Sequence, residues 1–147
     1  MSSTRVLIAD DHAFMRRGLR TILEGSQKYE VCGEAADGNQ TLQLAENLAP
    51  DILILDISMP PPNGLEVAAQ LQKTRPDTKI LIITMHDSEE MLHAAVAAGA
   101  SAYLLKSDAE ELLLTALNRL EEDQHFVSPT LHPKPAKHFW TKLSTED

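Results

Sequence analysis

Five short aliphatic runs, separated by longer amphipathic segments, constrain the fold of this chain more than any other feature of its sequence. Four of the runs are apolar at consecutive positions, which is typical of parallel strands whose sheet is covered on both faces. The predicted strands are RVLIAD at 5–10, YEVCGEA at 29–35, DILILD at 51–56, KILIIT at 79–84 and SAYLLK at 101–106. The second run is polar at alternate positions, so we expect it nearer an edge of the sheet.

The segments between these runs carry apolar residues at helical spacing. The predicted helices cover 13–24, 38–48, the stretch from 65 to 71, 88–98 and 108–121. Capping-box spacing marks three of the starts, in the pairs Asp37 with Gln40, Asp87 with Glu90 and Ser107 with Glu110. Gly99 follows the fourth helix, where a left-handed residue commonly ends a helix. Five β–α repeats predict an α/β fold, a doubly wound parallel sheet with right-handed crossovers.

The composition changes near residue 124. Residues 1–124 contain ten Lys and Arg against twenty Asp and Glu, whereas residues 125–147 contain three against two. The tail also has prolines at 129, 133 and 135 and no sustained period, which favours an extended linker over a second folded domain. We therefore predict one domain over 1–124 and a linker over 125–147.

The net charge of −9 and the single cysteine bear on which partners and which compartment we expect for this chain. An acidic chain repels phosphate backbones, so we expect these 147 residues to bind no nucleic acid by themselves. Cys32 has no partner for an internal disulfide. No aliphatic run approaches the length of a membrane span, and the first residues form no charged-then-apolar leader, so we expect a cytoplasmic protein without membrane contact.

Polar residues stand at or just after the ends of four predicted strands. They are Asp10 and Asp11 for the first, Asp56 for the third, Thr84 for the fourth and Lys106 for the fifth. Function in open parallel sheets is found at the carboxyl ends of the strands, so we expect these side chains to share one site. A helix cap is the alternative role for Asp11, and a turn is the alternative role for Asp56.

The residue types in this set suit phosphoryl transfer. Neighbouring carboxylates raise one another's pKa unless a cation lies among them, and oxygen ligands suit Mg²⁺. A carboxylate is also a nucleophile toward phosphorus, and the transferred group needs a metal and a fixed cation around its oxygens. In this hypothesis Lys106 supplies the cation and Thr84 a hydroxyl.

The order of these residues resembles that of the response-regulator receiver family over nearly all of residues 5–122. The matching motifs are Asp10-Asp11, Asp56 followed by SMP and NGLE, Thr84, and Tyr103 with Lys106. The resemblance implies a flavodoxin-like (βα)5 fold with strand order 2-1-3-4-5. It also implies that Asp56 is the phosphoacceptor, that a histidine kinase is the phosphodonor and that Mg²⁺ is the cofactor.

The same resemblance implies individual roles. Asp11 and Asp56 are expected to bind Mg²⁺ directly, with Asp10 and the backbone carbonyl of Ser58 completing the protein ligands. Thr84 and Tyr103 match the switch pair that relays phosphorylation to the surface of the fourth helix, fifth strand and fifth helix. The protein is then no conventional enzyme, because it catalyses only its own phosphorylation and dephosphorylation.

Some stretches are similar to one subfamily of receivers. DDHAFMRRGLRTIL, TMHDSEEML and AYLLKSDAEEL resemble regulators with a LuxR/NarL-type helix-turn-helix effector, and HFVSPTL and KLSTED resemble the linker and the start of that effector. The resemblance implies regulation of transcription and dimerisation on phosphorylation. DNA binding is expected only through an effector domain that these 147 residues do not contain.

Two other functions stay open at this point. A flavodoxin-like flavin carrier needs amides and glycine after the first strand, where DDHAF offers acids. A phosphorylation-independent receiver that only binds other proteins is opposed by the complete acid set. Met85 beside Thr84 and the Pro60-Pro61-Pro62 run nevertheless leave it open. His86 is near the predicted site and could contact the water that removes the phosphoryl group, but a surface position is its simplest interpretation.

Overall fold

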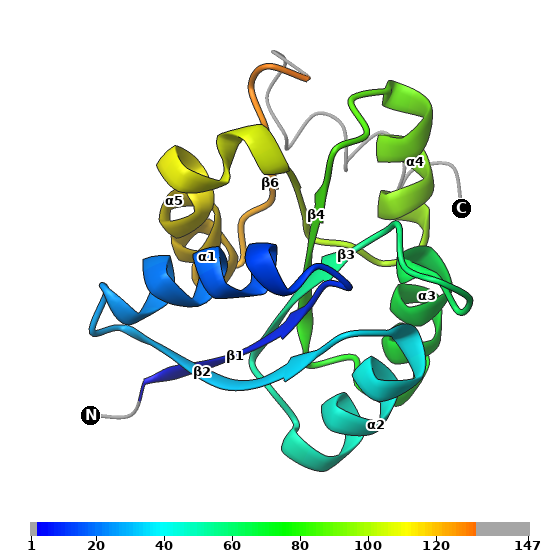
Figure 1. Cartoon of the computed structure of the whole chain (residues 1–147). Coiled ribbons are helices and arrows are strands. Elements are labelled where there is room, and N and C mark those ends of the chain that lie inside the picture. Colours follow the sequence, from blue (N-terminus) through cyan, green and yellow to red (C-terminus); the bar gives the residue numbers. More distant parts are fainter. Residues whose placement is uncertain (1–2, 132–147) are drawn as a thin grey trace.

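The computed structural model describes residues 3–131, which form one sheet between two layers of helices (Figure 1). All neighbouring strands are parallel, and their order is β2-β1-β3-β4-β5-β6. The strands are β1 (Thr4–Ala9), β2 (Tyr29–Ala35), β3 (Ile52–Asp56), β4 (Lys79–Thr84), β5 (Ala102–Leu105) and β6 (Phe126–Val127). The helices are α1 (Ala13–Glu24), α2 (Gly38–Leu48), α3 (Gly64–Thr74), α4 (Glu89–Ala97) and α5 (Ala109–Glu121), with a 3₁₀ turn, η1 (Lys106–Asp108), before α5.

The core lies on both faces of the sheet because side chains along each strand alternate between them. In β1, Leu7 belongs to the cluster under α2, α3 and α4, whereas Ile8 belongs to the cluster under α1 and α5. Within residues 3–131, no helix has both the length and the apolar character needed to cross a membrane. The fold is the doubly wound, flavodoxin-like α/β fold that the sequence predicts.

The strand bounds differ by at most one residue from those predicted. Two of the predicted helix-end features are confirmed: Asp37 accepts a hydrogen bond from the Gln40 amide at 2.7 Å, and Gly99 has a φ of 104°. The other two caps are wrong. Helix α4 starts one residue later than expected, so Ser88 caps it in place of Asp87. Before α5, the turn η1 occupies the position predicted for a cap at Ser107.

The strand β6 was not predicted. It lies in the segment that we interpret from sequence as a linker, and it pairs with β5, with Phe126 opposite Ala102 and Val127 opposite Tyr103. Both of its side chains are buried. The sheet therefore continues beyond the composition change at residue 124. The predicted effector-like stretch KLSTED lies outside the described residues.

Candidate functional site

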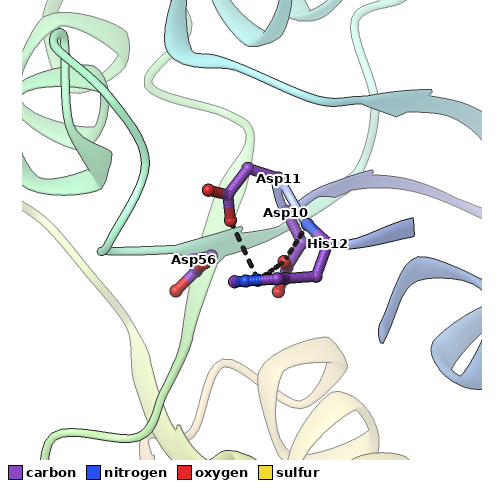
Figure 2. A group of neighbouring side chains, drawn as sticks. All are labelled: Asp10, Asp11, His12 and Asp56. Carbon is purple, nitrogen blue, oxygen red and sulfur yellow. Dashed lines mark hydrogen bonds and ion pairs between the residues drawn. The ribbon is translucent and has the colours of Figure 1, made fainter. Parts of the chain in front are cut away.

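Three carboxylates and an imidazole meet at the carboxyl ends of β1 and β3 (Figure 2). Ligand atoms of Asp10, Asp11, His12 and Asp56 all lie within 4.8 Å of one another. Asp10 and Asp56 are almost completely buried, at 0% and 1% exposure, whereas the side chain of Asp11 is 29% exposed. His12, not Asp11, is the N-cap residue of α1, so the capping alternative for Asp11 is wrong.

The loop after β3 is shaped to hold Asp56 in place. The Ser58 amide donates a hydrogen bond to Asp56 Oδ1 at 3.2 Å, and the Gly64 amide donates one to the Ile57 carbonyl at 3.0 Å. A Cβ atom on Gly64 would lie only 2.2 Å from the Asp56 carbonyl oxygen. Glycine is therefore required where α3 begins. Its Asn63 cap, paired with Glu66 in a capping box, fixes this start.

Lys106, the first residue of η1, brings a cation to the buried acids. Its Nζ lies 2.9 Å from Asp10 Oδ2 and 3.4 Å from Asp56 Oδ2. The contact with Asp10 is an ion pair and not a well-aligned hydrogen bond, so Asp10 Oδ2 has no hydrogen-bond partner among the described residues. We refer to Asp10, Asp11, Asp56 and Lys106 together as the carboxylate cluster.

The charges in this cluster are unbalanced. Burial raises the pKa of Asp56, the negative charge of Asp10 raises it further, and the Ser58 amide and Lys106 oppose these effects without cancelling them. Burial lowers the pKa of Lys106, but its contacts with Asp10 and Asp56 outweigh burial, and the pKa is raised overall. One lysine is therefore shared by several acids, and a further cation is favoured electrostatically.

The donor set fits a hard divalent cation. Carboxylate oxygens from two strand ends face one another, and the buried Asp10 Oδ2 lacks a hydrogen bond within residues 3–131. Mg²⁺ binds one or two carboxylates and keeps several waters, which the exposed side of Asp11 allows. The cluster could hold such an ion. The role of the Ser58 carbonyl as a metal ligand stays a prediction.

Thr84 and Tyr103 both bind the loop that follows β4. The Thr84 hydroxyl accepts a hydrogen bond from the His86 amide at 3.0 Å, and the Tyr103 hydroxyl donates one to the His86 carbonyl at 2.7 Å. Burial, followed by the negative charge of Asp87, raises the pKa of Tyr103 to about 12. Tyr103 is fully buried and bound to the loop between β4 and α4, which is the position from which a switch residue could act on that loop.

Two histidines contact residues of the site, and no contact was predicted for the first of them, His12. His12 Nδ1 lies 3.0 Å from Asp11 Oδ1 and 3.3 Å from Asp10 Oδ1, and its place directly after the two acids is the signal that could have indicated this. His86 is exposed, as expected, but its Nε2 also forms a hydrogen bond with Ser58 Oγ at 3.0 Å. Met85 is 81% exposed, so its side chain is not packed into the site.

Comparison with known proteins assigns this arrangement to a family. The family described as response regulator receiver domain matches residues 6–118, a span that contains the whole carboxylate cluster. The chain belongs to the response-regulator receiver family. The receiver is 38% identical over 144 residues to the oxygen regulatory protein NreC of Staphylococcus epidermidis, an alignment that covers 97% of the receiver and 66% of NreC. The chain thus spans about two thirds of the length of that relative.

Solved structures agree with this assignment. A two-component response regulator of the LuxR family from Aurantimonas sp. SI85-9A1 has a TM-score of 0.86 at 31% identity, and the match covers 93% of this receiver and 98% of that chain. RcsB, in a structure of two dimers bound to two parallel DNAs, has a TM-score of 0.82 at 27% identity, with 88% of this receiver and 66% of the RcsB chain covered. The receiver is therefore of the LuxR/NarL type.

Proposed function

We propose that the receiver accepts a phosphoryl group on Asp56 from a histidine kinase and so controls an effector in a two-component pathway. The observation that carries the proposal is the buried Asp56 carboxylate with the Lys106 ammonium 3.4 Å from its Oδ2. A nucleophilic carboxylate, a fixed cation and further oxygen ligands are the groups that phosphoryl transfer to an acid requires.

In the transfer, an Asp56 carboxylate oxygen forms a bond to phosphorus while the P–N bond to the kinase histidine breaks and that nitrogen takes up a proton. Lys106 stabilises the negative charge on the phosphoryl oxygens, and the Thr84 hydroxyl donates a hydrogen bond to one of them. Hydrolysis later adds water to phosphorus and breaks the P–O bond to Asp56, which restores the carboxylate. The receiver thus catalyses its own phosphorylation and dephosphorylation and is no conventional enzyme.

Mg²⁺ is the proposed cofactor. Asp11 and Asp56 would hold it directly, with Asp10 and the Ser58 carbonyl as the remaining protein ligands. When bound, the ion supplies the positive charge that offsets the buildup of negative charge on the transferred group. The unbalanced charge of the carboxylate cluster supports this assignment, since Asp56 is disfavoured as an anion and, within residues 3–131, Lys106 alone forms an ion pair with it.

The proposed output is regulation of transcription in the cytoplasm. RcsB, a relative, forms dimers that bind DNA. By analogy, phosphorylation of this receiver shifts Thr84 and Tyr103, alters the surface of α4, β5 and α5, and promotes a homodimer. DNA contact then comes through an effector domain outside the 147 residues, because the chain itself carries a net charge of −9.

The test is phosphorylation of the full chain with acetyl phosphate and Mg²⁺, measured by intact mass. The wild type is expected to gain one phosphate, chelation is expected to prevent the gain, and Asp56→Asn is expected to abolish it. Asp77→Asn, which changes an exposed acid, is the matched control and should behave as the wild type. A wild type that takes up no phosphate with Mg²⁺ present favours a receiver that acts only by binding other proteins.

A further inference from the structure

The residues that follow β6 bind the chain on both sides of Lys106, at the backbone of β5 before it and at the Asp108 side chain after it. Ser128 is completely buried, its amide donates a hydrogen bond to the Tyr103 carbonyl at 2.9 Å, and its Oγ accepts one from the Leu105 amide at 2.8 Å. At the end of η1, the Thr130 hydroxyl donates a hydrogen bond to Asp108 Oδ2 at 3.0 Å. Lys106 thus begins a turn that the tail holds at Leu105 and at Asp108.

The Ser128 hydroxyl has a specific task in this arrangement. Strand β6 ends at Val127, so no further strand residue pairs with the last residue of β5 on that side. Buried backbone amides are almost always paired, and Ser128 Oγ supplies the partner that the Leu105 amide lacks. A side chain without an oxygen at this position leaves the amide of the residue directly before Lys106 unsatisfied.

The position of Lys106 depends on this strand end. Its ammonium reaches Asp10 and Asp56 from the first residue of η1, directly after Leu105. A shift of the Leu105 backbone moves the base of the Lys106 side chain, and small misplacements of a charged group at a reacting centre reduce rates strongly.

We propose that Ser128 is a positioning residue for Lys106 and, through it, links the start of the tail to the phosphorylation site. The proposal rests on the function assigned to Asp56 above. Thermodynamic linkage makes the effect reciprocal, so a change at Asp56 that moves Lys106 also alters the hydrogen bonds of Ser128. The segment that leads out of the sheet is then coupled to the phosphorylation site without passing through the surface of α4.

The test combines Ser128→Ala with Lys106→Met in the full chain. Ser128→Ala is expected to slow phosphorylation by acetyl phosphate and Mg²⁺ roughly tenfold. On the Lys106→Met background, which is itself slow, it is expected to cause no further slowing, because the lysine that it positions is gone. Thr78→Ala is the matched control. It removes another buried hydroxyl, which donates to the Pro50 carbonyl at 2.8 Å, and is expected to lower the melting temperature without slowing phosphorylation.

Equal slowing by Ser128→Ala on both backgrounds, or a wild-type rate in the single variant, overturns the proposal. If Ser128→Ala does not fold, Ser128→Cys takes its place, because its sulfur is a much weaker acceptor for the Leu105 amide, and a smaller slowing that likewise disappears on the Lys106→Met background is expected. A second measurement needs no phosphate. The urea midpoints of the metal-free wild type, the two single variants and the double variant show whether the effects of Ser128→Ala and Lys106→Met on stability are additive. Non-additive effects support the positioning role, and additive effects refute it, even if the wild type accepts no phosphate and the proposed function fails.

Discussion

Two groups of charged side chains lie at opposite ends of the sheet, and their carboxylates have opposite electrostatic environments. At the amino ends of β1 and β2, Glu121 is bound by Lys28 Nζ at 2.7 Å, by the Tyr29 hydroxyl at 3.1 Å and by the Thr4 hydroxyl. Burial acts to raise the pKa of Glu121, but these three hydrogen bonds outweigh burial, and the pKa is lowered. The Glu121 carboxylate is therefore stabilised as an anion by its own neighbours.

At the carboxyl ends of the strands the outcome is reversed. Asp56 is buried beside Asp10, and Lys106 must serve both acids, so the pKa of Asp56 is raised. Neighbouring groups thus stabilise the Glu121 anion, whereas burial and Asp10 disfavour the charged form of Asp56. Such a difference is expected between a structural ion pair and the site that we propose at the carboxylate cluster.

The largest expected difference between the two ends is their response to Mg²⁺. Ion binding to the carboxylate cluster should stabilise the wild type by about 2.7 kcal/mol at a hundredfold excess over Kd. Asp11→Ala should lose most of this gain and remain folded, because Asp11 is partly exposed. Glu121→Gln should keep the full gain. Thermal unfolding with and without Mg²⁺ measures the effect, and a gain that persists in Asp11→Ala places the metal elsewhere.

Removal of one negative charge in metal-free buffer should change the free energy of unfolding in opposite directions at the two ends. Asp56→Asn removes the buried charge whose pKa is raised, Lys106 keeps its ion pair with Asp10, and the Asn oxygen can still accept the Ser58 amide, so the free energy of unfolding should rise by about 1–2 kcal/mol. Glu121→Gln weakens the hydrogen bonds from Lys28 and Tyr29, so the free energy of unfolding of this variant should fall by about 1–2 kcal/mol. Urea unfolding with EDTA present decides this. Two changes of the same sign contradict the contrast between the sites.

The pH dependence of these two effects is the smallest expected signal. The Glu121 pKa is lowered by folding, so its stabilisation is present above the ordinary value of about 4.3 and disappears as the pH falls through the folded pKa. The Asp56 pKa is raised, so stability is retained below the ordinary value of about 3.9 and is lost as the pH rises through the folded pKa. Both variants should therefore approach wild-type stability in acid and diverge from it in opposite directions as the pH rises. Urea midpoints measured across this range check the prediction, and it fails if either difference persists in acid.

Much of the fold was predictable because local periodicity determines it. Runs such as 52–55 are apolar at every position and are buried on both faces, so the strands could be assigned without tertiary information. The carboxylate cluster followed from the rule that strand ends meet at one edge of a parallel sheet. Asp10, Asp11, Asp56 and Lys106 are brought together as expected.

Features that depend on tertiary pairing could not be predicted in the same way. β6 has only two residues, too few for a period, and its strand character comes from pairing with β5. The bond between His86 and Ser58 joins two loops, which no local pattern encodes. The cap assignments at Asp87 and Ser107 failed because a one-residue shift of a helix start changes the capping residue.

The most direct test of the central claim is to locate the phosphoryl group chemically. The full chain is treated with acetyl phosphate and Mg²⁺, the acyl phosphate is reduced with borohydride to homoserine, and the digested chain is sequenced by mass spectrometry. We expect homoserine at position 56, with Asp10 and Asp11 unchanged. Homoserine at Asp10, Asp11 or another acid, with Asp56 intact, contradicts it.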